Sequence, residues 1–205
     1  MSTIKTIIFD LGGVLIDWNP EYVFLNAFKG DNKKMQWFLN TICTMDWNEN
    51  QDAGYPIAKA TDDLVLKYPE YETYIRMYYG EWEHMIGGAI EGSVKVLKYF
   101  IDNENYKVVA LTNWSAETFP IAQKRFDFLN WFEGIVVSGD EKTRKPFIDI
   151  YNIILNRYKI EPKTAIFIDD NIKNIETARK LSIHAIHFKN PKQLISELKQ
   201  YNINI

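Results

Sequence analysis

The chain has 205 residues, 46% of them hydrophobic and 25% charged, which is typical of a folded globular protein. Its formal net charge of -3 gives no general attraction to nucleic acid or anionic lipid, and no run approaches the roughly 20 apolar residues that span a bilayer. The amino terminus shows no cleavage-site pattern, and the single cysteine, Cys43, has no partner for a disulfide. We expect a cytoplasmic protein that binds a small molecule, as a monomer or a homodimer.

Five short apolar runs rich in β-branched residues predict buried strands, at residues 4–9, 107–111, 134–137, 165–168 and 185–188. Between them, apolar residues recur at steps of three and four within 94–101, 148–155 and 172–181, which predicts helices with one buried face. The alternation predicts an α/β fold with a Rossmann-like parallel sheet. Such sheets bind ligands at the carboxyl ends of their strands, so functional residues are expected directly after each strand.

The segment 18–85 interrupts this alternation. It is rich in aromatic residues and in helix-like patterns, and it contains no convincing buried strand. We predict an inserted helical unit at 18–85, so that residues 1–17 and 86–205 form the α/β core. The glycines at 87, 88 and 92 are expected to return the chain to the sheet.

Acidic residues stand directly after two of the predicted strands. Asp10 opens a glycine-containing turn after the first strand, and Asp169 and Asp170 follow the fourth. Burying an unpaired carboxylate is costly, so a cation or a set of donors should face Asp10. The acidic pair alone is equally well explained as a solvated turn or a helix cap, but parallel strands open at one edge of the sheet, where all three carboxylates can meet. Magnesium, which prefers oxygen ligands, fits such a cluster best.

Two further strand ends carry polar residues. Thr112 and Asn113 follow the second strand and offer a hydroxyl and an amide to a phosphate group. Lys145, which precedes Pro146 after the third strand, supplies a positive charge. Each residue alone is an ordinary turn or surface residue, but the succession of acid, hydroxyl, lysine and paired acids forms a strong pattern.

This pattern resembles the haloacid dehalogenase (HAD) superfamily of phosphohydrolases. The first motif of the family matches Asp10-Leu11-Gly12-Gly13-Val14, the second Thr112, the third Lys145-Pro146 and the fourth Asp169-Asp170. The resemblance covers nearly the whole chain, and segment 18–85 resembles the helical cap that follows the first motif. It implies a hydrolase similar to the sugar-1-phosphate phosphatases that have glycine two residues after the nucleophile.

The resemblance also implies roles for the matched residues. Asp10 would attack phosphorus in line and form an aspartyl-phosphate, while Thr112 and Lys145 would hold the phosphoryl oxygens of a small phosphate ester. Asn113 and Asn174 would be further substrate contacts. Mg²⁺ would be bound by Asp10, the backbone carbonyl of Gly12 and Asp170, with Asp169 helping directly or through water.

The sequence departs from the family pattern at Gly12. Most phosphatases of this family carry a second aspartate there, which serves as general acid and base, a contribution typically worth ~10²–10⁴ in rate. A good leaving group, such as an anomeric sugar phosphate or an acyl phosphate, needs less protonation, or another residue substitutes. Asp17 is close enough in sequence to be considered, although a turn residue at the hinge of the insert is the simpler interpretation.

Two other functions fit part of the pattern. A 2-haloacid dehalogenase uses an aspartate nucleophile without a metal and also lacks the second acid, but it gains nothing from the clustered carboxylates of Asp169 and Asp170. A weakly catalytic or non-catalytic protein that binds a phosphorylated ligand would keep the fold and the metal site and leave Asp10 unphosphorylated. We therefore place a magnesium-dependent phosphohydrolase first.

Overall fold

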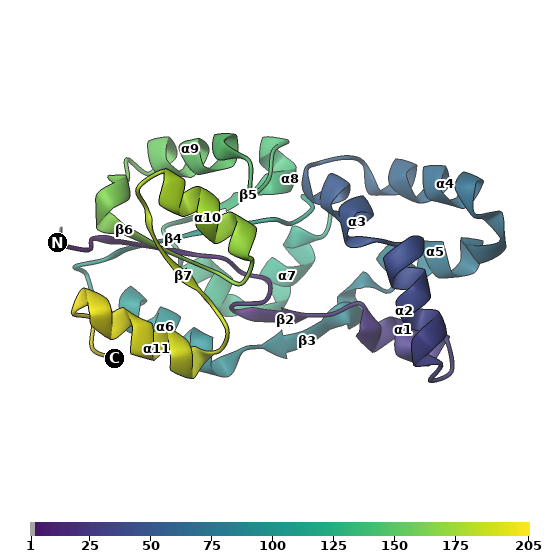
Figure 1. Ribbon diagram of the computed structural model, residues 1–205, viewed down its shortest axis with the longest axis horizontal. Coiled ribbons are helices and arrows are strands. Elements are labelled where there is room, and N and C mark those ends of the chain that lie inside the picture. Colours follow the sequence, from purple (N-terminus) through teal and green to yellow (C-terminus); the bar gives the residue numbers. More distant parts are fainter. Residues whose placement is uncertain (1–2) are drawn as a thin grey trace.

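A five-stranded parallel sheet forms the centre of the computed structural model, which describes residues 3–205 (Figure 1). The strands are β1 (Thr6–Phe9), β4 (Lys107–Thr112), β5 (Gly134–Val137), β6 (Ala165–Asp169) and β7 (His184–His187). Their spatial order is β5-β4-β1-β6-β7, and every neighbouring pair is parallel. The α/β prediction is confirmed, and all five predicted strands are present.

Helices cover both faces of the sheet because alternate strand residues point to opposite sides. The core helices are α6 (Glu91–Ile101), α7 (Phe119–Arg125), α8 (Ser138–Glu141), α9 (Ile148–Arg157), α10 (Ile172–Lys180) and α11 (Pro191–Leu198). Ile8 and Phe167 belong to the hydrophobic cluster of α9 and α10, whereas Ile7 and Ile166 belong to the cluster of α6, α7 and α11. The three helices predicted from periodicity are α6, α9 and α10.

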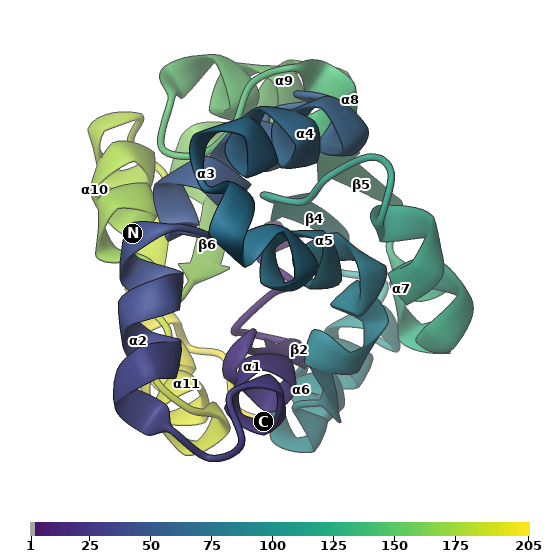
Figure 2. The same ribbon diagram turned by 90° about the vertical axis from the view of Figure 1, so that its right-hand side faces the viewer.

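A helical insert lies to one side of the sheet, between β2 (Ile16–Trp18) and β3 (Ile86–Ala89) (Figures 1 and 2). Its helices are α1 (Glu21–Ala27), α2 (Asn32–Thr41), α3 (Met45–Asp52), α4 (Ile57–Lys67) and α5 (Glu72–Gly80). We call residues 19–85 the insert. The division of the chain into two domains at residues 18 and 85 stays a prediction.

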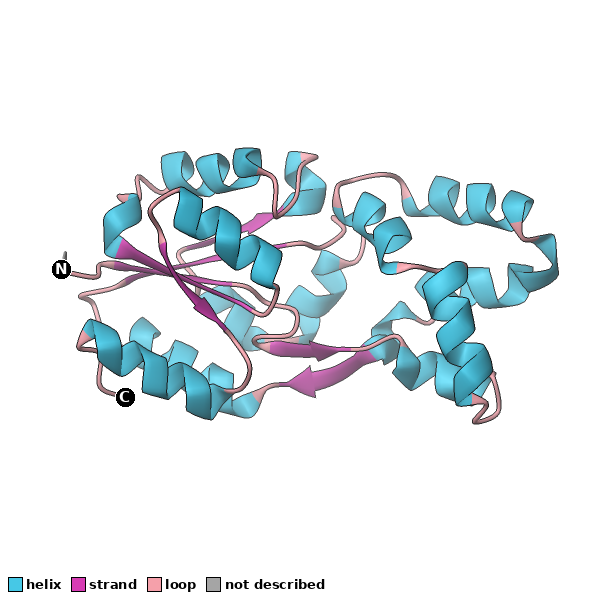
Figure 3. Ribbon diagram, in the orientation of Figure 1, coloured by secondary structure: helices cyan, strands magenta, loops and turns pink. Residues whose placement is uncertain are grey.

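The strands β2 and β3 form a separate antiparallel ribbon that joins the insert to the core (Figure 3). The sequence did not predict this ribbon, because β2 is only three residues long and β3 contains two glycines instead of an apolar run. Trp18, which we placed at the start of the insert, pairs with Ile86 in the ribbon. Within residues 3–205, no helix combines the length and the apolar character needed to cross a lipid bilayer.

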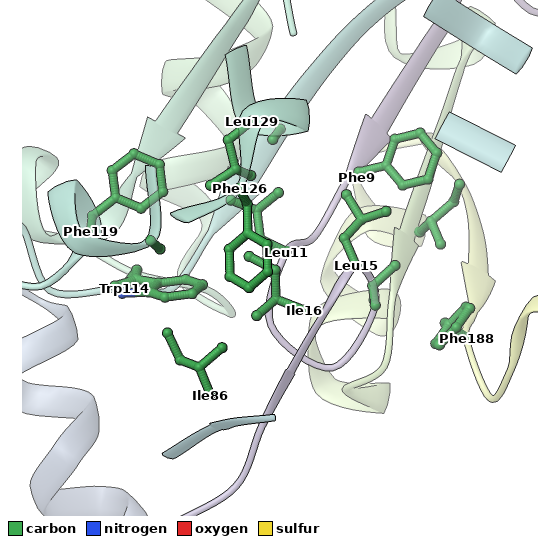
Figure 4. Close-up of a cluster of buried hydrophobic side chains, with 14 of the residues drawn as sticks. Phe9, Leu11, Leu15, Ile16, Ile86, Trp114, Phe119, Phe126, Leu129 and Phe188 are labelled. Carbon is green, nitrogen blue, oxygen red and sulfur yellow. The ribbon is translucent and has the colours of Figure 1, made fainter. Parts of the chain in front are cut away.

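The turn after β1 is held by buried apolar side chains on both sides of it. Leu11, Leu15 and Ile16 are fully buried, and Figure 4 shows them in one cluster of buried hydrophobic side chains that also contains Ile86 of the ribbon and Trp114 of the core. The backbone amides of Leu15 and Ile16 both donate to the carbonyl of Leu11, at 2.8 and 2.9 Å. The residues that follow β1 are therefore fixed by packing and by hydrogen bonds.

Candidate active site

Asp10 stands at the carboxyl end of the central strand. Its backbone amide continues the sheet by donating to the carbonyl of Ile168 at 2.8 Å, so the residue is held in place by β6. Its carboxylate Oδ1 accepts hydrogen bonds from the Leu11 amide at 2.7 Å and from the Lys145 ammonium at 2.8 Å. Because both of these contacts use Oδ1, the second oxygen is left available to a ligand.

Lys145 is almost completely buried, with 1% of its surface exposed. Its Nζ lies 2.8 Å from Asp10 Oδ1 and 2.7 Å from Asp169 Oδ2, and it donates to the Leu111 carbonyl at 2.9 Å. Burial alone lowers the pKa of this ammonium, but the adjacent Asp10 and Asp169 outweigh burial and raise its pKa. Lys145 is therefore a permanent cation beside Asp10.

Asn113 fixes the backbone of Lys145 rather than its ammonium. The side-chain oxygen of Asn113 accepts from the Lys145 amide at 2.8 Å, and its nitrogen donates to the Lys145 carbonyl at 2.9 Å. This pair of hydrogen bonds ties the end of β4 to the loop that carries Lys145. The predicted contact between Asn113 and a phosphate group stays a prediction.

Asp169 is fully buried, and both of its carboxylate oxygens are occupied. Oδ1 accepts from the Asn171 amide at 2.8 Å, Oδ2 pairs with Lys145, and the Asn174 side chain donates to both oxygens at 3.0 Å. Asn174 comes from the first turn of α10, which Asn171 caps by accepting from the Lys173 amide. Asp169 thus orients Lys145 and the start of α10.

Asp170 completes a group of three carboxylates. Asp10, Asp169 and Asp170 have oxygens that all lie within 4.8 Å of one another, and Asp170 is the exposed member. Together with Lys145 we call them the strand-end cluster. Loss of hydration and the charge of Asp169 raise the pKa of Asp170, and burial raises the pKa of Asp10 well above its usual value against the opposing effect of Lys145.

The charges of the strand-end cluster do not balance. One ammonium faces three carboxylates, which leaves two negative charges without a partner in the cluster. A divalent cation removes this imbalance, and oxygen ligands are the ones that Mg²⁺ prefers. The donor set therefore fits a magnesium ion.

One buried polar group at the end of β4 has no partner. The hydroxyl oxygen of Thr112 is buried and has no hydrogen-bond partner within residues 3–205, a situation that costs about 1–3 kcal/mol unless a ligand relieves it.

Gly13 lies beside Asp170, with a φ of +72°, and a Cβ at this position would be 2.2 Å from Asp170 Oδ2. The turn therefore needs glycine here to let the carboxylate approach.

The strand-end cluster opens into a cleft of about 600 Å³. Its core side includes Asp10, Gly12, Lys145 and Asp170, and its other side comes from α3 of the insert. The remaining lining residues are Gly13, Trp18, Met45, Asn48, Glu49, Asp52, Trp82, Asn113, Trp114, Asn171, Ile172, Asn174 and His187. A cleft of this size and mixed lining suits a small molecule.

Comparison with protein families decides the class of this site. The family model of the haloacid dehalogenase-like hydrolases matches residues 7–188, a range that contains the strand-end cluster and the insert. The chain belongs to this family. It is an enzyme, a haloacid dehalogenase-like hydrolase, as the sequence pattern predicted.

Several known proteins resemble this hydrolase over most of its length. The sesquiterpene phosphatase astK of Aspergillus oryzae is 24% identical over 204 residues, which cover 97% of each chain. The phosphorylated carbohydrates phosphatase of Thermotoga maritima is 20% identical over 187 residues, covering 89% of this chain and 84% of the relative. The HAD family enzyme bt-2542 of Bacteroides thetaiotaomicron, solved in complex with magnesium and inorganic phosphate, is 22% identical and matches with a TM-score of 0.71 over 91% of this chain and 95% of its own.

Gly12 leaves this hydrolase without a side chain where most phosphatases of the family have an acid. A Cβ built at Gly12 would meet no atom within 4 Å, so the structure has room for a side chain at this position. Asp17, the substitute considered from sequence, lies in β2 and accepts a hydrogen bond from the Tyr22 hydroxyl at 2.7 Å. It is not among the residues that line the cleft.

Of the residues selected from the four motifs, Asp10, Lys145, Asp169 and Asp170 meet in the strand-end cluster, whereas Thr112 is fully buried and does not line the cleft. Sequence reasoning missed the contribution of α3, namely Asn48, Glu49 and Asp52. It also missed Arg144, whose guanidinium pairs with Glu49 of the insert at 2.7 Å. No motif spacing marks these residues, because they reach the site only when the insert folds against the sheet.

Proposed function

We propose that this hydrolase is a magnesium-dependent phosphohydrolase that acts on a small phosphorylated metabolite through an aspartyl-phosphate on Asp10. The observation that carries the proposal is the strand-end cluster, in which a carboxylate with one available oxygen lies against a buried lysine and two further carboxylates. Phosphoryl transfer spreads negative charge over several oxygens, so positioned positive charge is what such a reaction requires.

The residues of the cluster have separate roles in this proposal. Asp10 attacks phosphorus, and the Lys145 ammonium opposes the effect of burial on the pKa of Asp10 and neutralises charge on the phosphoryl oxygens. The unpartnered hydroxyl of Thr112 donates to one of these oxygens. Asp169 positions Lys145 through the 2.7 Å ion pair, and Asn113 positions the same residue through its backbone.

Magnesium would be held by Asp10, the Gly12 carbonyl and Asp170, and when bound it supplies positive charge to the phosphoryl group. Direct ligation by Asp169 stays a prediction, since its oxygens already accept bonds from Lys145, Asn174 and the Asn171 amide. The fit of this donor set to a divalent cation also separates the proposal from a dehalogenase, because halide displacement needs no such cation.

The nature of the substrate is a finer part of the proposal. The relatives described above act on a sesquiterpene phosphate or on phosphorylated carbohydrates by their names, and one was crystallised with magnesium and phosphate, which supports a small phosphate ester. Trp18 and Trp114 line the cleft with buried indole N–H groups that have no partner within residues 3–205. We propose that these groups and the insert, acting as a cap, select the leaving group.

The test is phosphate release from acetyl phosphate, p-nitrophenyl phosphate, several sugar-1-phosphates and a prenyl monophosphate, with magnesium or with a chelator. Asp10→Asn is the nucleophile variant, and Asp17→Asn, which changes a carboxylate outside the cleft, is the matched control. We expect release that needs both magnesium and Asp10 and that survives in Asp17→Asn. Release no faster than that of Asp10→Asn on every ester would overturn the proposal, and halide release from 2-chloropropionate would then favour the dehalogenase.

A further inference from the structure

The cleft needs a proton donor that Gly12 does not supply. When an ester oxygen leaves phosphorus it carries negative charge, and a positioned acid typically accelerates its departure by ~10²–10⁴. The cleft is lined by six titratable side chains, those of Asp10, Glu49, Asp52, Lys145, Asp170 and His187. The donor should be one of them.

Most of these groups already have another role or partner in the structure. Asp10, Lys145 and Asp170 belong to the strand-end cluster. His187 contacts the Asp170 carbonyl through Nε2 at 2.8 Å, at the far edge of the sheet. Glu49 is paired with the Arg144 guanidinium at 2.7 Å, so its carboxylate already has a partner. Asp52 is the group that remains.

Asp52 lies at the carboxyl ends of the strands although it belongs to the insert. It is the last residue of α3, and its backbone carbonyl accepts a hydrogen bond from the Ser138 hydroxyl, directly after β5. The same hydroxyl oxygen accepts from the Trp114 amide at 2.9 Å, two residues beyond the end of β4. Since β4 is the neighbour of β1, these contacts hold Asp52 near the carboxyl ends of the strands, where Asp10 also lies.

The carboxyl group of Asp52 is held by a chain of side chains in the insert. Asn48, one turn earlier in α3, donates to Asp52 Oδ2 at 3.0 Å. The orientation of the Asn48 amide is set in turn by the Tyr79 hydroxyl of α5, which donates to Asn48 Oδ1 at 3.0 Å. A carboxyl group oriented in this way is preorganised to exchange a proton with a ligand in the cleft.

The surroundings of Asp52 favour its neutral form. Burial and the neighbouring charge of Glu49 raise its pKa, whereas the backbone amide of Ser115 and the guanidinium of Arg144 lower it, and the result is a pKa of about 7. From α5 the group faces Tyr78 and Tyr79, whose own pKa values are raised by burial, so both are neutral. Near neutral pH the group is therefore populated in both of its protonation states.

We propose that Asp52 is the general acid and base that replaces the missing side chain at position 12. This inference rests on the proposed phosphatase function. In the first step an Asp10 oxygen bonds to phosphorus, the bond from phosphorus to the leaving oxygen breaks, and that oxygen takes the proton of Asp52. In the second step the Asp52 carboxylate takes a proton from water, the water oxygen bonds to phosphorus, and the bond between phosphorus and the Asp10 oxygen breaks, which releases phosphate and regenerates the Asp10 carboxylate.

The experiment is a leaving-group series with Asp52→Asn. The leaving groups of acetyl phosphate and p-nitrophenyl phosphate depart without being protonated, whereas those of phenyl phosphate and glycerol phosphate need a proton. We expect kcat/KM of Asp52→Asn to stay within a few-fold of the parent on the first pair and to fall by ~10²–10⁴ on the second. With glycerol phosphate, kcat of the parent should fall as pH rises through about 7, and this limb should be absent from the variant.

Two further variants keep the test independent of a folding defect. Asp46→Asn removes an exposed carboxylate from the same helix outside the cleft, and its leaving-group series should match that of the parent. Gly12→Asp adds a carboxyl group where the structure has room, so the double variant with Asp52→Asn should recover turnover of glycerol phosphate.

The outcomes separate this inference from the proposed function. A parent enzyme that releases no phosphate from any ester contradicts the phosphatase itself. An active parent whose Asp52→Asn variant loses the same factor on all four esters, or shows no loss, contradicts the role of Asp52. Selective loss on the poor leaving groups, with recovery by Gly12→Asp, supports it.

Discussion

The two walls of the cleft are built in different ways. On the core wall, Asp10 follows β1, Asp169 ends β6 and Lys145 lies in the loop after α8, and each is fixed by a backbone amide or carbonyl of the core. On the insert wall, Asn48 and Asp52 lie on a single helix and are held by other side chains. The core wall is therefore as rigid as the sheet, whereas the insert wall depends on how α3 meets the core.

This difference suggests a division of labour. In the proposed mechanism, the bond-making groups, which tolerate little displacement, lie where the sheet defines their positions. The groups proposed to contact the leaving oxygen and the rest of the substrate lie on an element that can vary without disturbing the sheet. If the comparison is correct, changes in the core wall should damage stability and chemistry together, and changes in the insert wall should separate them.

The largest effect is expected from Lys145→Met. The substitution removes the cation that faces Asp10 and Asp169 and leaves two carboxylates without their partner in a buried site. Breaking a buried ion pair in this way costs about 3–5 kcal/mol, and we expect phosphate release to fall by ~10³ or more. Urea unfolding and the phosphate assay measure the two effects, with the exposed Lys163→Met as the matched control. A loss of activity with unchanged stability would mean that the core wall is not held as described.

A smaller effect is expected from the glycines of the turn after β1. In Gly13→Ala, the new Cβ would lie 2.2 Å from Asp170 Oδ2 at a φ of +72°, so the backbone or the carboxylate must move, at a cost of about 1–3 kcal/mol. Gly12→Ala is the matched variant, because its Cβ meets nothing within 4 Å. Thermal unfolding and magnesium titration calorimetry should show a loss in Gly13→Ala and little change in Gly12→Ala. Equal behaviour of the two variants would contradict the close approach of Asp170 to the turn.

The same division explains what the sequence revealed and what it did not. Strands such as 165–168 were recognisable because both faces of the sheet are buried, which produces continuous apolar runs, and two of the five runs are followed directly by the acids Asp10 and Asp169. The ribbon of β2 and β3 left no such signal, since Asp17 and the glycines of β3 carry no alternating pattern.

The insert wall could not be inferred from spacing. In the sequence Asp52 is an acid two residues before Gly54, and its place in the cleft with Asp10 depends on the Ser138 hydrogen bond, the Glu49–Arg144 ion pair and the packing of α3 against α8. Lys145 was found from the sequence, but its contact with the Leu111 carbonyl was not, because that contact depends on the register of β4 beside β1. Local patterns thus predict the elements and the ends of strands, while contacts between distant segments require the folded chain.

The smallest effect concerns stability alone and tests whether the insert wall holds Asp52 in its neutral form. In the folded protein the pKa of Asp52 is raised to about 7 from an ordinary value of 3.8. Between these two values the folded state binds a proton that the unfolded state does not. The stability contributed by the protonated group is therefore fully present below about pH 4 and is lost as pH rises through about 7.

Asp52→Asn should consequently become more stable relative to the parent as pH rises from 5 to 8. The whole difference in pKa would correspond to about 4 kcal/mol, and because Asp52 is partly accessible to water we expect about 1–2 kcal/mol. Urea unfolding of both proteins at several pH values measures the change, and subtracting one curve from the other cancels the titration of Asp10 and Asp170 that they share. The exposed Asp46→Asn should run parallel to the parent. Parallel curves for Asp52→Asn as well would show that the carboxyl group is ionised throughout this range, and the insert wall would then have no proton to give near neutral pH.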